Sequence, residues 1–154
     1  MDIASAASGS GSPHLLSYVP AALYHWMQRR VRARMGSPRI LMLTTVGSDS
    51  GEPQTVALGY FEDGLDLVVT ASNYGSDQHP TWYRNMSAHP QVGVQIEENF
   101  WEMVAFTASS SKRAQLRVRL ATEDKLYGRY QQNTAREIPI ILLRPVEPVL
   151  TGRI

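Results

Sequence analysis

Five short runs rich in β-branched and aromatic side chains dominate the middle of this 154-residue chain. Such side chains favour strands, because they pack well on a pleated, half-buried surface. The runs cover residues 40–46, 55–61, 65–71, 92–96 and 101–107. Asp63-Gly64 separates the second run from the third, and Glu97-Glu98-Asn99 separates the fourth from the fifth, which in both places predicts a tight hairpin. Neighbouring strands are therefore expected to pair antiparallel.

Helical patterns and a sixth run complete the expected fold. Residues 138–143 are rich in Ile and Leu, as in a strand buried on both faces. Apolar residues recur at helical spacing over residues 20–35, and further helices are expected over residues 79–88 and 112–132. The sequence thus predicts an α+β fold, a six-stranded antiparallel barrel with an N-terminal helix and two inserted helices. Residues 1–17 are expected to form a flexible leader, and residues 18–154 a single domain.

Composition narrows the classes of function. The chain has no cysteine, which excludes disulfides and thiolate chemistry and fits a cytoplasmic protein. A net charge of +1 and the absence of a recognition motif argue against a nucleic-acid partner. The four histidines show no ligand spacing, so no metal site is expected. The arginines of residues 20–35 form either a solvated face or a weak contact with an anionic membrane surface.

Two segments combine small polar residues in patterns that suit a ligand. The first is the loop Gly47, Ser48, Asp49, Ser50 and Gly51, which follows Thr45 at the end of the first strand. It can turn backbone N–H groups inward as a nest for an anion, or it can be an ordinary hairpin connection.

The second segment, residues 72–85, sets small polar groups and a helix start beside Trp82 and Tyr83. Donors next to an aromatic wall suit a flat heteroaromatic ligand, unless the rings belong to the core. Further along, Tyr127 and Tyr130 are three residues apart on one helix. One of these phenols can donate a proton to a substrate oxygen, or both can simply pack the helix against its neighbours.

Three stretches carry a resemblance to a known family: ILMLTTVGSDSGEPQ, LVVTASNYGSDQHPTWYRNMSAHPQV and YGRYQQNTAREIPIILLRPV. In this order and spacing they resemble the actinobacterial deazaflavin-dependent nitroreductase family. Its members are small split β-barrels, similar to flavin reductases and FMN-binding proteins, that use the deazaflavin coenzyme F-420. The resemblance covers residues 38–146. It implies an oxidoreductase that transfers hydride to an activated double bond or a nitroaromatic molecule.

The resemblance also implies roles for particular residues. The substrate space would be lined by Tyr60, Ser72, Tyr127 and Tyr130, with a hydroxyl orienting a flat, apolar acceptor. The coenzyme's acidic tail would lie over the loop of residues 47–51 and its ring between the barrel and residues 72–83. The implied coenzyme-binding residues are Thr45, Gly47, Ser48, Asp49, Ser50, Gly51, Gln54, Asn73, Gly75, His79, Trp82 and Arg136. Split barrels of this kind often pair, which implies a homodimer.

The chain departs from the family at basic positions. Coenzyme-binding relatives carry Arg-Lys where this chain has Ser48-Asp49, and they carry basic residues near Gln54 and Asp77-Gln78. Each lost charge-assisted hydrogen bond is worth about 1.5–3 kcal/mol. Arg84, Lys112 and Arg136 are the residues that can compensate. A second prediction therefore stands beside the first: a member without the coenzyme that acts as a cofactor-independent tailoring enzyme or binds a lipid or aromatic metabolite.

Overall fold

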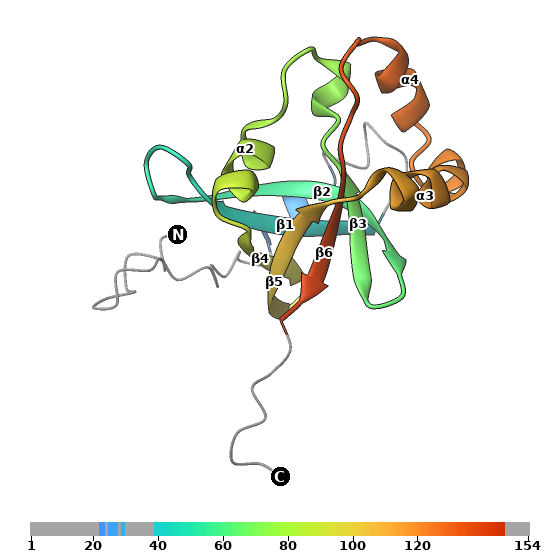
Figure 1. Cartoon of the computed structure of the whole chain (residues 1–154). Coiled ribbons are helices and arrows are strands. Elements are labelled where there is room, and N and C mark those ends of the chain that lie inside the picture. Colours follow the sequence, from blue (N-terminus) through green and yellow to red (C-terminus); the bar gives the residue numbers. More distant parts are fainter. Residues whose placement is uncertain (1–21, 24, 28, 30–38, 147–154) are drawn as a thin grey trace.

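The fold is that of a computed structural model, which describes residues 22–23, 25–27, 29 and 39–146. In this part of the chain six strands close into a barrel in the order β1-β2-β3-β6-β5-β4, with every neighbouring pair antiparallel (Figure 1). The strands are β1 Arg39–Val46, β2 Pro53–Asp63, β3 Asp66–Thr70, β4 Gln91–Ile96, β5 Asn99–Thr107 and β6 Ile140–Pro145. The predicted α+β fold with a six-stranded antiparallel barrel is confirmed.

Both predicted hairpins are present. Asp63 pairs with Asp66 across the turn from β2 to β3, where Gly64 has a φ of +63° that glycine adopts without a Cβ clash. Ile96 pairs with Asn99 across the turn from β4 to β5. These turns fix the register that directs one set of side chains into the barrel.

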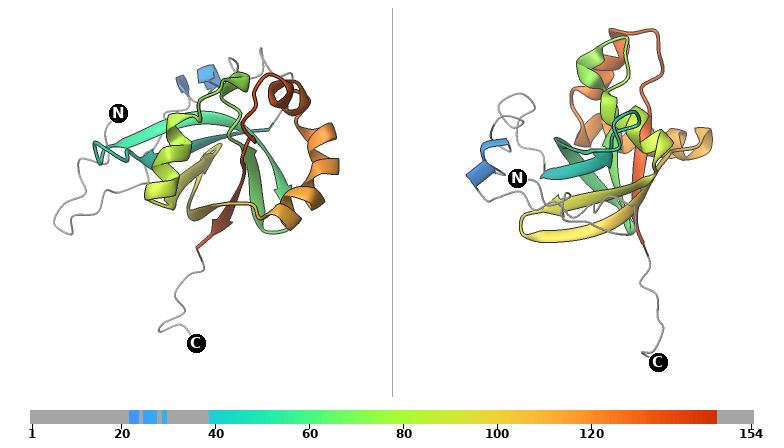
Figure 2. Two further views of the ribbon diagram at one scale, coloured as in Figure 1. Left: turned by 45° about the horizontal axis from the view of Figure 1, so that its top comes forward. Right: turned by 90° about the vertical axis from the view of Figure 1, so that its left-hand side faces the viewer.

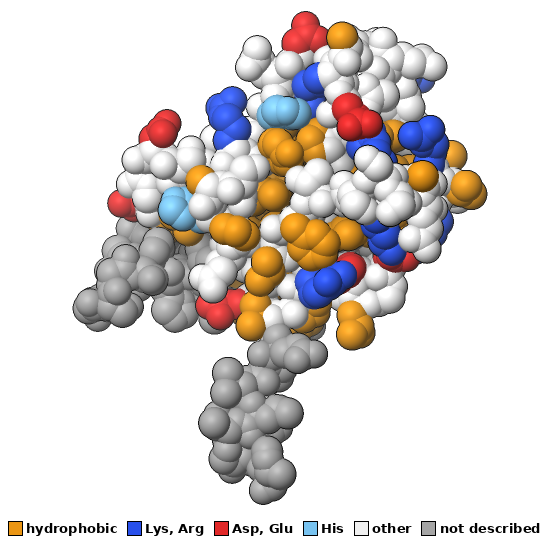
Figure 3. Space-filling view, in the orientation of Figure 1, with side chains coloured by type: hydrophobic (Ala, Val, Ile, Leu, Met, Phe, Trp, Pro, Cys, Tyr) orange, Lys and Arg blue, Asp and Glu red, His pale blue; other side chains and the backbone are white. Residues whose placement is uncertain are grey.

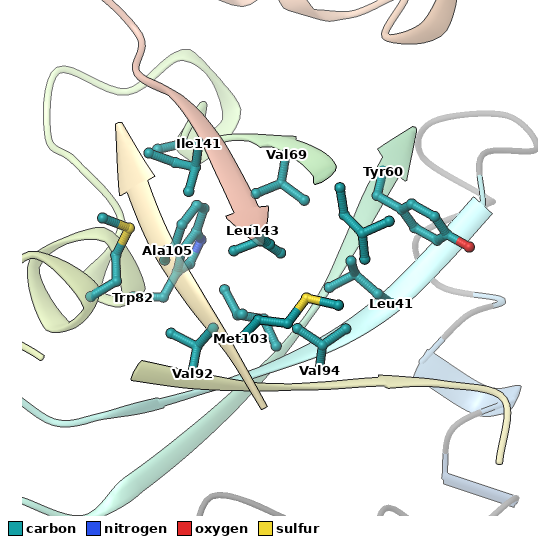
Figure 4. Packing of buried hydrophobic residues seen from close by; sticks show 14 residues of the cluster. Leu41, Tyr60, Val69, Trp82, Val92, Val94, Met103, Ala105, Ile141 and Leu143 are labelled. Carbon is teal, nitrogen blue, oxygen red and sulfur yellow. The ribbon is translucent and has the colours of Figure 1, made fainter. Parts of the chain in front are cut away.

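The barrel interior is a packed apolar core. Leu41, Val69, Val94, Ile141 and Leu143 are each at most 2% exposed and point toward one another inside the barrel (Figure 4). Burying a side chain of this size contributes about 1.5–3 kcal/mol to folding. Because side chains fill the interior, a ligand site is expected on the outside of the strands.

Strand β6 is buried on both faces, as its apolar run predicts. Ile141 and Leu143 belong to the interior cluster, whereas Ile140 and Leu142 lie in a second cluster outside the barrel. That second cluster includes Leu116 and Leu120 of helix α3, Ser110–Glu123. Helix α3 is therefore held against the barrel by its apolar face.

The expectation of one helix over residues 112–132 is wrong. The chain forms α3, Ser110–Glu123, and a separate helix α4, Tyr127–Gln132. Asp124 leaves the helical conformation, with φ −127° and ψ 88°. Its carboxylate Oδ2 accepts a hydrogen bond from Thr70 Oγ1 of β3 at 3.1 Å. This tertiary contact outweighs the local helical preference and brings Asp124 to the barrel.

Three short elements gather at one end of the barrel (Figures 1 and 2). They are helix α2, Thr81–Ala88, the single turn η2, Asn73–Gly75, and α4. Beside β2, the described residues of the predicted N-terminal helix are helical, and Met27 packs against Ile40 and Met42. The rest of residues 20–35, with most of its arginines, and the leader of residues 1–17 lie outside the described residues.

Charged side chains are spread over the face shown in Figure 3, where acidic and basic groups alternate with apolar ones. This mixture agrees with the net charge of +1. Among the described residues, no helix has the length and apolar character needed to cross a membrane.

Candidate functional site

A cavity of about 800 Å³ lies against the outside of β2. Small-molecule sites typically have volumes of about 300–1,000 Å³. Four parts of the chain line it: residues 54–59 of β2, several residues between Thr70 and Arg84, the pair Asp124 and Tyr130, and the pair Trp26 and Met27. The cavity therefore joins the barrel wall to the group of short elements at its end.

Strand β2 gives the cavity a flat floor. Val56 and Leu58 pack against the barrel core, so the alternation of a strand turns Thr55, Ala57 and Gly59 outward. These three side chains are small, which leaves space above the strand. The floor suits a flat ligand.

A chain of hydrogen bonds runs from the cavity edge to a buried carboxylate. Ser72 Oγ lies 2.9 Å from Thr70 Oγ1, which lies 3.1 Å from Asp124 Oδ2. Ser72 is 9% exposed and lines the cavity together with the other two residues. Burial raises the pKa of Asp124, and this effect exceeds the opposing effect of the Thr70 hydrogen bond and of the nearby backbone N–H groups of Leu126 and Tyr127.

Arg136 holds the segment that carries Ser72. Its Nε donates to the Ser76 carbonyl at 2.8 Å, its Nη2 to the Ser72 carbonyl at 2.8 Å and its Nη1 to the Ala71 carbonyl at 3.3 Å. The planar guanidinium offers several donors in a fixed geometry, which a lysine cannot reproduce. Arg136 thus fixes the shape of the cavity wall and does not itself line the cavity.

Arg136 also sets the state of His79. Its Nη1 lies 3.0 Å from His79 Nδ1, and a guanidinium has only donors, so Nδ1 is the acceptor and the neutral ring carries its proton on Nε2. Burial lowers the pKa of His79, and the positive charges of Arg136 and Arg84 lower it further. A neutral imidazole with an Nε2–H donor therefore borders the cavity.

The loop of residues 47–51 is an ordinary hairpin connection rather than an open nest. The Gly47 N–H donates to the Glu52 carbonyl, the Gly51 N–H to the Gly47 carbonyl and the Ser48 N–H to Asn85 Oδ1, at 2.8 to 2.9 Å. Three of the five amides are thus engaged within the protein. Asp49 and Ser50 are exposed at the tip. These three donors are therefore not open to an anion.

Asn85 connects this loop to the cavity wall. The residue is 1% exposed on α2, and its Nδ2 donates to Thr45 Oγ1 at 3.0 Å and to Gln54 Oε1 at 2.9 Å. Gln54 lines the cavity, whereas Thr45 is fully buried. The sequence reasoning gave Asn85 no role, although a polar residue on the same helix face as Trp82 and Met86 is a signal for such a network.

The structure separates the four tyrosine and serine hydroxyls predicted to meet the substrate. Ser72 and Tyr130 line the cavity. Tyr127 instead accepts a hydrogen bond from Arg113 Nη2 at 2.6 Å and packs against the α3 cluster. Tyr60 belongs to the barrel core, with the Arg39 guanidinium 5.0 Å from its ring centre. Neither Tyr60 nor Tyr127 lines the cavity, because the first packs in the barrel core and the second packs toward α3.

Only some of the predicted coenzyme-binding residues line the cavity. Gln54, Asn73, His79 and Trp82 line the cavity. Trp82 is only 6% exposed and points into the barrel core (Figure 4). Tyr74, Tyr130 and Trp26 are further aromatic residues of the cavity, and the rings of the two tyrosines meet edge to face with centres 6.3 Å apart. Sequence reasoning assigned the wall to Trp82 and missed Thr70 and Asp124, because only tertiary contacts bring those two to the cavity.

Of the three basic residues that could replace the relatives' missing positive charges, only one lines the cavity. Lys112 Nζ forms an ion pair with Asp63 at 2.6 Å, and Arg136 is engaged with backbone carbonyls. Arg84 lines the cavity from α2. Among the described lining residues it is the one lysine or arginine.

Gly75 is required where η2 meets α4. It has a φ of +80°, and a Cβ there would lie 3.2 Å from the backbone of Tyr130. We expect Gly75→Ala to lower the free energy of unfolding by at least about 1–2 kcal/mol, the cost of a left-handed residue, with crowding added. Gly64→Ala is the matched control, because Gly64 has a φ of +63° and nothing within 4 Å of its Cβ position. Denaturant unfolding measures both variants. If Gly75→Ala and Gly64→Ala lose the same free energy of unfolding, the contact between η2 and α4 is not tight.

Comparison with known proteins gives the family. The family model described as F420H(2)-dependent quinone reductase matches residues 21–145. A Mycobacterium tuberculosis protein named F420H(2)-dependent quinone reductase is 29% identical over 126 residues, which are 79% of this chain and 85% of the relative. A second M. tuberculosis protein with the same family name is 34% identical over 105 residues, 68% of this chain and 88% of that relative.

Solved structures agree with this assignment. The structure described as an F420-H2 dependent reductase has a TM-score of 0.63 and 29% identity, covering 69% of this chain and 94% of that one. The heme storage protein HutZ of Vibrio cholerae, with 15% identity and a TM-score of 0.57, shares the fold alone; the match covers 79% of this chain and 92% of that one. The fold and site thus define a split-barrel protein of the oxidoreductase class. The chain belongs to the F420H(2)-dependent quinone reductase family, which confirms the resemblance and the prediction of an enzyme.

Proposed function

We propose that the protein is a reductase that uses the reduced deazaflavin coenzyme F-420 to reduce a flat, apolar acceptor such as a quinone, an activated double bond or a nitroaromatic molecule. The observation that carries this proposal is the cavity over β2, where small outward side chains, several aromatic rings and the Ser72 hydroxyl meet. The relatives named quinone reductases support the acceptor class.

The residues around the cavity fit the chemistry of the coenzyme. A deazaflavin is flat and polar at its edges, and its tail is anionic. The floor of β2 would hold the ring, with Gln54, Asn73 and His79 hydrogen-bonding its edge. Arg84 would bind the tail, and the tip residues Ser48, Asp49 and Ser50 lie beyond Gln54, where the tail would leave the cavity. Once bound, the coenzyme supplies the hydride.

Ser72 and Tyr130 are the proposed acceptor-binding residues. Hydride transfer to a conjugated carbonyl or quinone places negative charge on oxygen, and a fixed hydroxyl donor stabilises that charge in a site with little water. Both residues line the cavity, Ser72 just after β3 and Tyr130 on α4. An acceptor between them would be held over the ring.

The test is turnover with a defined acceptor. Purified protein, reduced coenzyme and a water-soluble naphthoquinone are mixed, and the absorbance of the oxidised coenzyme is followed. We expect Tyr130→Phe to lower kcat at least about tenfold, as expected for loss of a donor to developing charge. Tyr127→Phe removes the same atom three residues away, outside the cavity, and is expected to turn over within about threefold of wild type. A larger loss of kcat in Tyr127→Phe than in Tyr130→Phe, or no turnover by the wild-type protein, would contradict the proposal.

Arg84 offers a prediction for coenzyme binding. Arg84→Glu is expected to weaken the dissociation constant of the oxidised coenzyme at least about tenfold, because a charge-assisted hydrogen bond worth about 1.5–3 kcal/mol is lost. Arg117→Glu on the exposed side of α3 changes net charge equally and is the control. Fluorescence titration measures both. Equal weakening in the two variants would mean that Arg84 acts only through overall charge.

A homodimer is part of the proposal. It is supported by a solved structure described as a domain-swapped dimer, with 25% identity and a TM-score of 0.63, covering 82% of this chain and all of that one. Sedimentation velocity tests it, since a monomer at micromolar concentration would rule out a stable pair.

A further inference from the structure

The Ser72–Thr70–Asp124 chain can carry a proton as well as hold a shape. It consists of two hydroxyls and one carboxyl in series, at 2.9 and 3.1 Å, and all three residues line the cavity. The second carboxylate oxygen, Asp124 Oδ1, is buried and has no hydrogen-bond partner among the described residues.

The direction of the hydrogen bonds depends on the charge of Asp124. Each hydroxyl has one proton to donate. When Asp124 is ionised it only accepts, so Thr70 donates to it, Ser72 donates to Thr70, and Ser72 turns a lone pair toward the cavity. When Asp124 is protonated it can donate to Thr70, Thr70 to Ser72, and Ser72 then has its proton free for a ligand. The carboxyl thus decides whether Ser72 is a donor or an acceptor.

The protonated form of Asp124 persists to higher pH than that of an exposed aspartate. Its pKa is raised by burial, against the lowering effect of the Thr70 hydrogen bond and of the nearby backbone N–H groups of Leu126 and Tyr127. No lysine or arginine of the described part of the chain forms an ion pair with it. The Tyr127 phenol, whose own pKa is raised chiefly by burial, is the titratable group of α4 that the carboxylate influences.

We propose that Asp124, Thr70 and Ser72 form a proton relay that protonates the oxygen of the acceptor in the cavity. The inference rests on the proposed function. The acceptor gains a hydride at a carbon atom or, in a quinone, at one oxygen. The acceptor oxygen that becomes negative then takes a proton from Ser72 Oγ. Ser72 regains its proton from Thr70, Thr70 from the Asp124 carboxyl, and the resulting carboxylate is protonated by solvent. Ser72 touches the acceptor, and Thr70 and Asp124 are positioning residues that act through it.

The kinetic test breaks the relay at its middle. Thr70→Val keeps the shape and removes the hydroxyl, and we expect kcat to fall by about 10²-fold or more, the range of lost acid–base assistance. Thr70→Ser should restore most of the turnover. Thr107→Val, which removes a hydroxyl on β5 outside the cavity, should keep a kcat near that of wild type.

The pH dependence of kcat is a further test. Because the protonated carboxyl is the donor, wild-type kcat should fall as pH rises through the Asp124 pKa. The Asp124→Asn variant should not show this fall. Wild-type turnover in Thr70→Val with an unchanged pH profile would overturn the relay.

A second readout needs no coenzyme. Carboxyl-labelled aspartate in carbon-13 NMR gives the titration of Asp124. Thr70→Val should raise the Asp124 pKa, because the hydroxyl that stabilises the carboxylate is lost, and Ser72→Ala should raise it by a smaller amount. An unchanged Asp124 titration in Thr70→Val would overturn the relay even if the enzyme turns over. Failure of the wild-type protein to bind the coenzyme would instead contradict the proposed function. The NMR result would still decide whether Ser72, Thr70 and Asp124 are coupled.

Discussion

Replacing Asn85 with leucine is expected to lower the free energy of unfolding by about 2–4 kcal/mol, because buried polar groups lose their partners at about 1–3 kcal/mol each. The Asn85 side chain accepts from the Ser48 N–H and donates to Thr45 and Gln54. Leucine has the same number and branching of side-chain heavy atoms as asparagine, so no cavity is left and the loss reports chiefly on the hydrogen bonds. The same change should also free the loop of residues 47–51 from α2.

Urea unfolding and hydrogen exchange of the Ser48 amide measure these two effects. Ser87→Leu on the same helix is the control, because Ser87 is exposed and surface substitutions usually change stability by less than about 0.5 kcal/mol. If Asn85→Leu unfolds at the wild-type urea concentration and the Ser48 amide stays protected, the network does not hold the loop.

Replacing Arg136 with methionine is expected to have two effects. Three backbone carbonyls of the segment from Ala71 to Ser76 lose a charged donor, which should lower the free energy of unfolding by about 1–3 kcal/mol in this half-buried setting. The pKa of His79 should rise, because both the donor to Nδ1 and a neighbouring positive charge are removed. Arg136→Lys should recover little of the stability, since one ammonium cannot reach three carbonyls.

NMR titration of the His79 ring separates the two effects. Arg144→Met is the control: Arg144 makes two hydrogen bonds to Asp66, at 2.9 and 2.8 Å, and none of those atoms belongs to the cavity. It should leave the His79 titration unchanged. A His79 pKa that does not rise in Arg136→Met would mean that the guanidinium neither fixes the tautomer nor disfavours the charged ring.

The barrel could be predicted because its signals are local. Runs of β-branched residues, the Asp63-Gly64 turn and the two-sided apolar run of β6 each depend on neighbours in sequence. The residues that line the cavity could be predicted only in part. Ser72, His79 and Tyr130 lie in segments whose composition points to a ligand, whereas Thr70 and Asp124 are 54 positions apart and meet through one hydrogen bond.

The wrong expectations share a cause. Residues 112–132 have continuous helical character, so the break at Asp124 is invisible until the barrel supplies Thr70 as a donor. Tyr127 and Tyr130 do lie three residues apart on α4, as predicted, but only Tyr130 borders the cavity. The glycines and serines of residues 47–51 fit a nest and a hairpin equally, and the buried Asn85 on α2 decides for the hairpin.

The departure from the family at Ser48-Asp49 makes coenzyme binding the central claim. The measurement that tests it most directly is a fluorescence titration of the wild-type protein with oxidised F-420, run beside FMN and heme because the fold is shared with flavin- and heme-binding proteins. The proposed function predicts that the deazaflavin binds most tightly, with a dissociation constant below about 10 μM, or near −7 kcal/mol. No binding of the deazaflavin at about 100 μM, or tighter binding of FMN or heme, would contradict it and favour the member without the coenzyme.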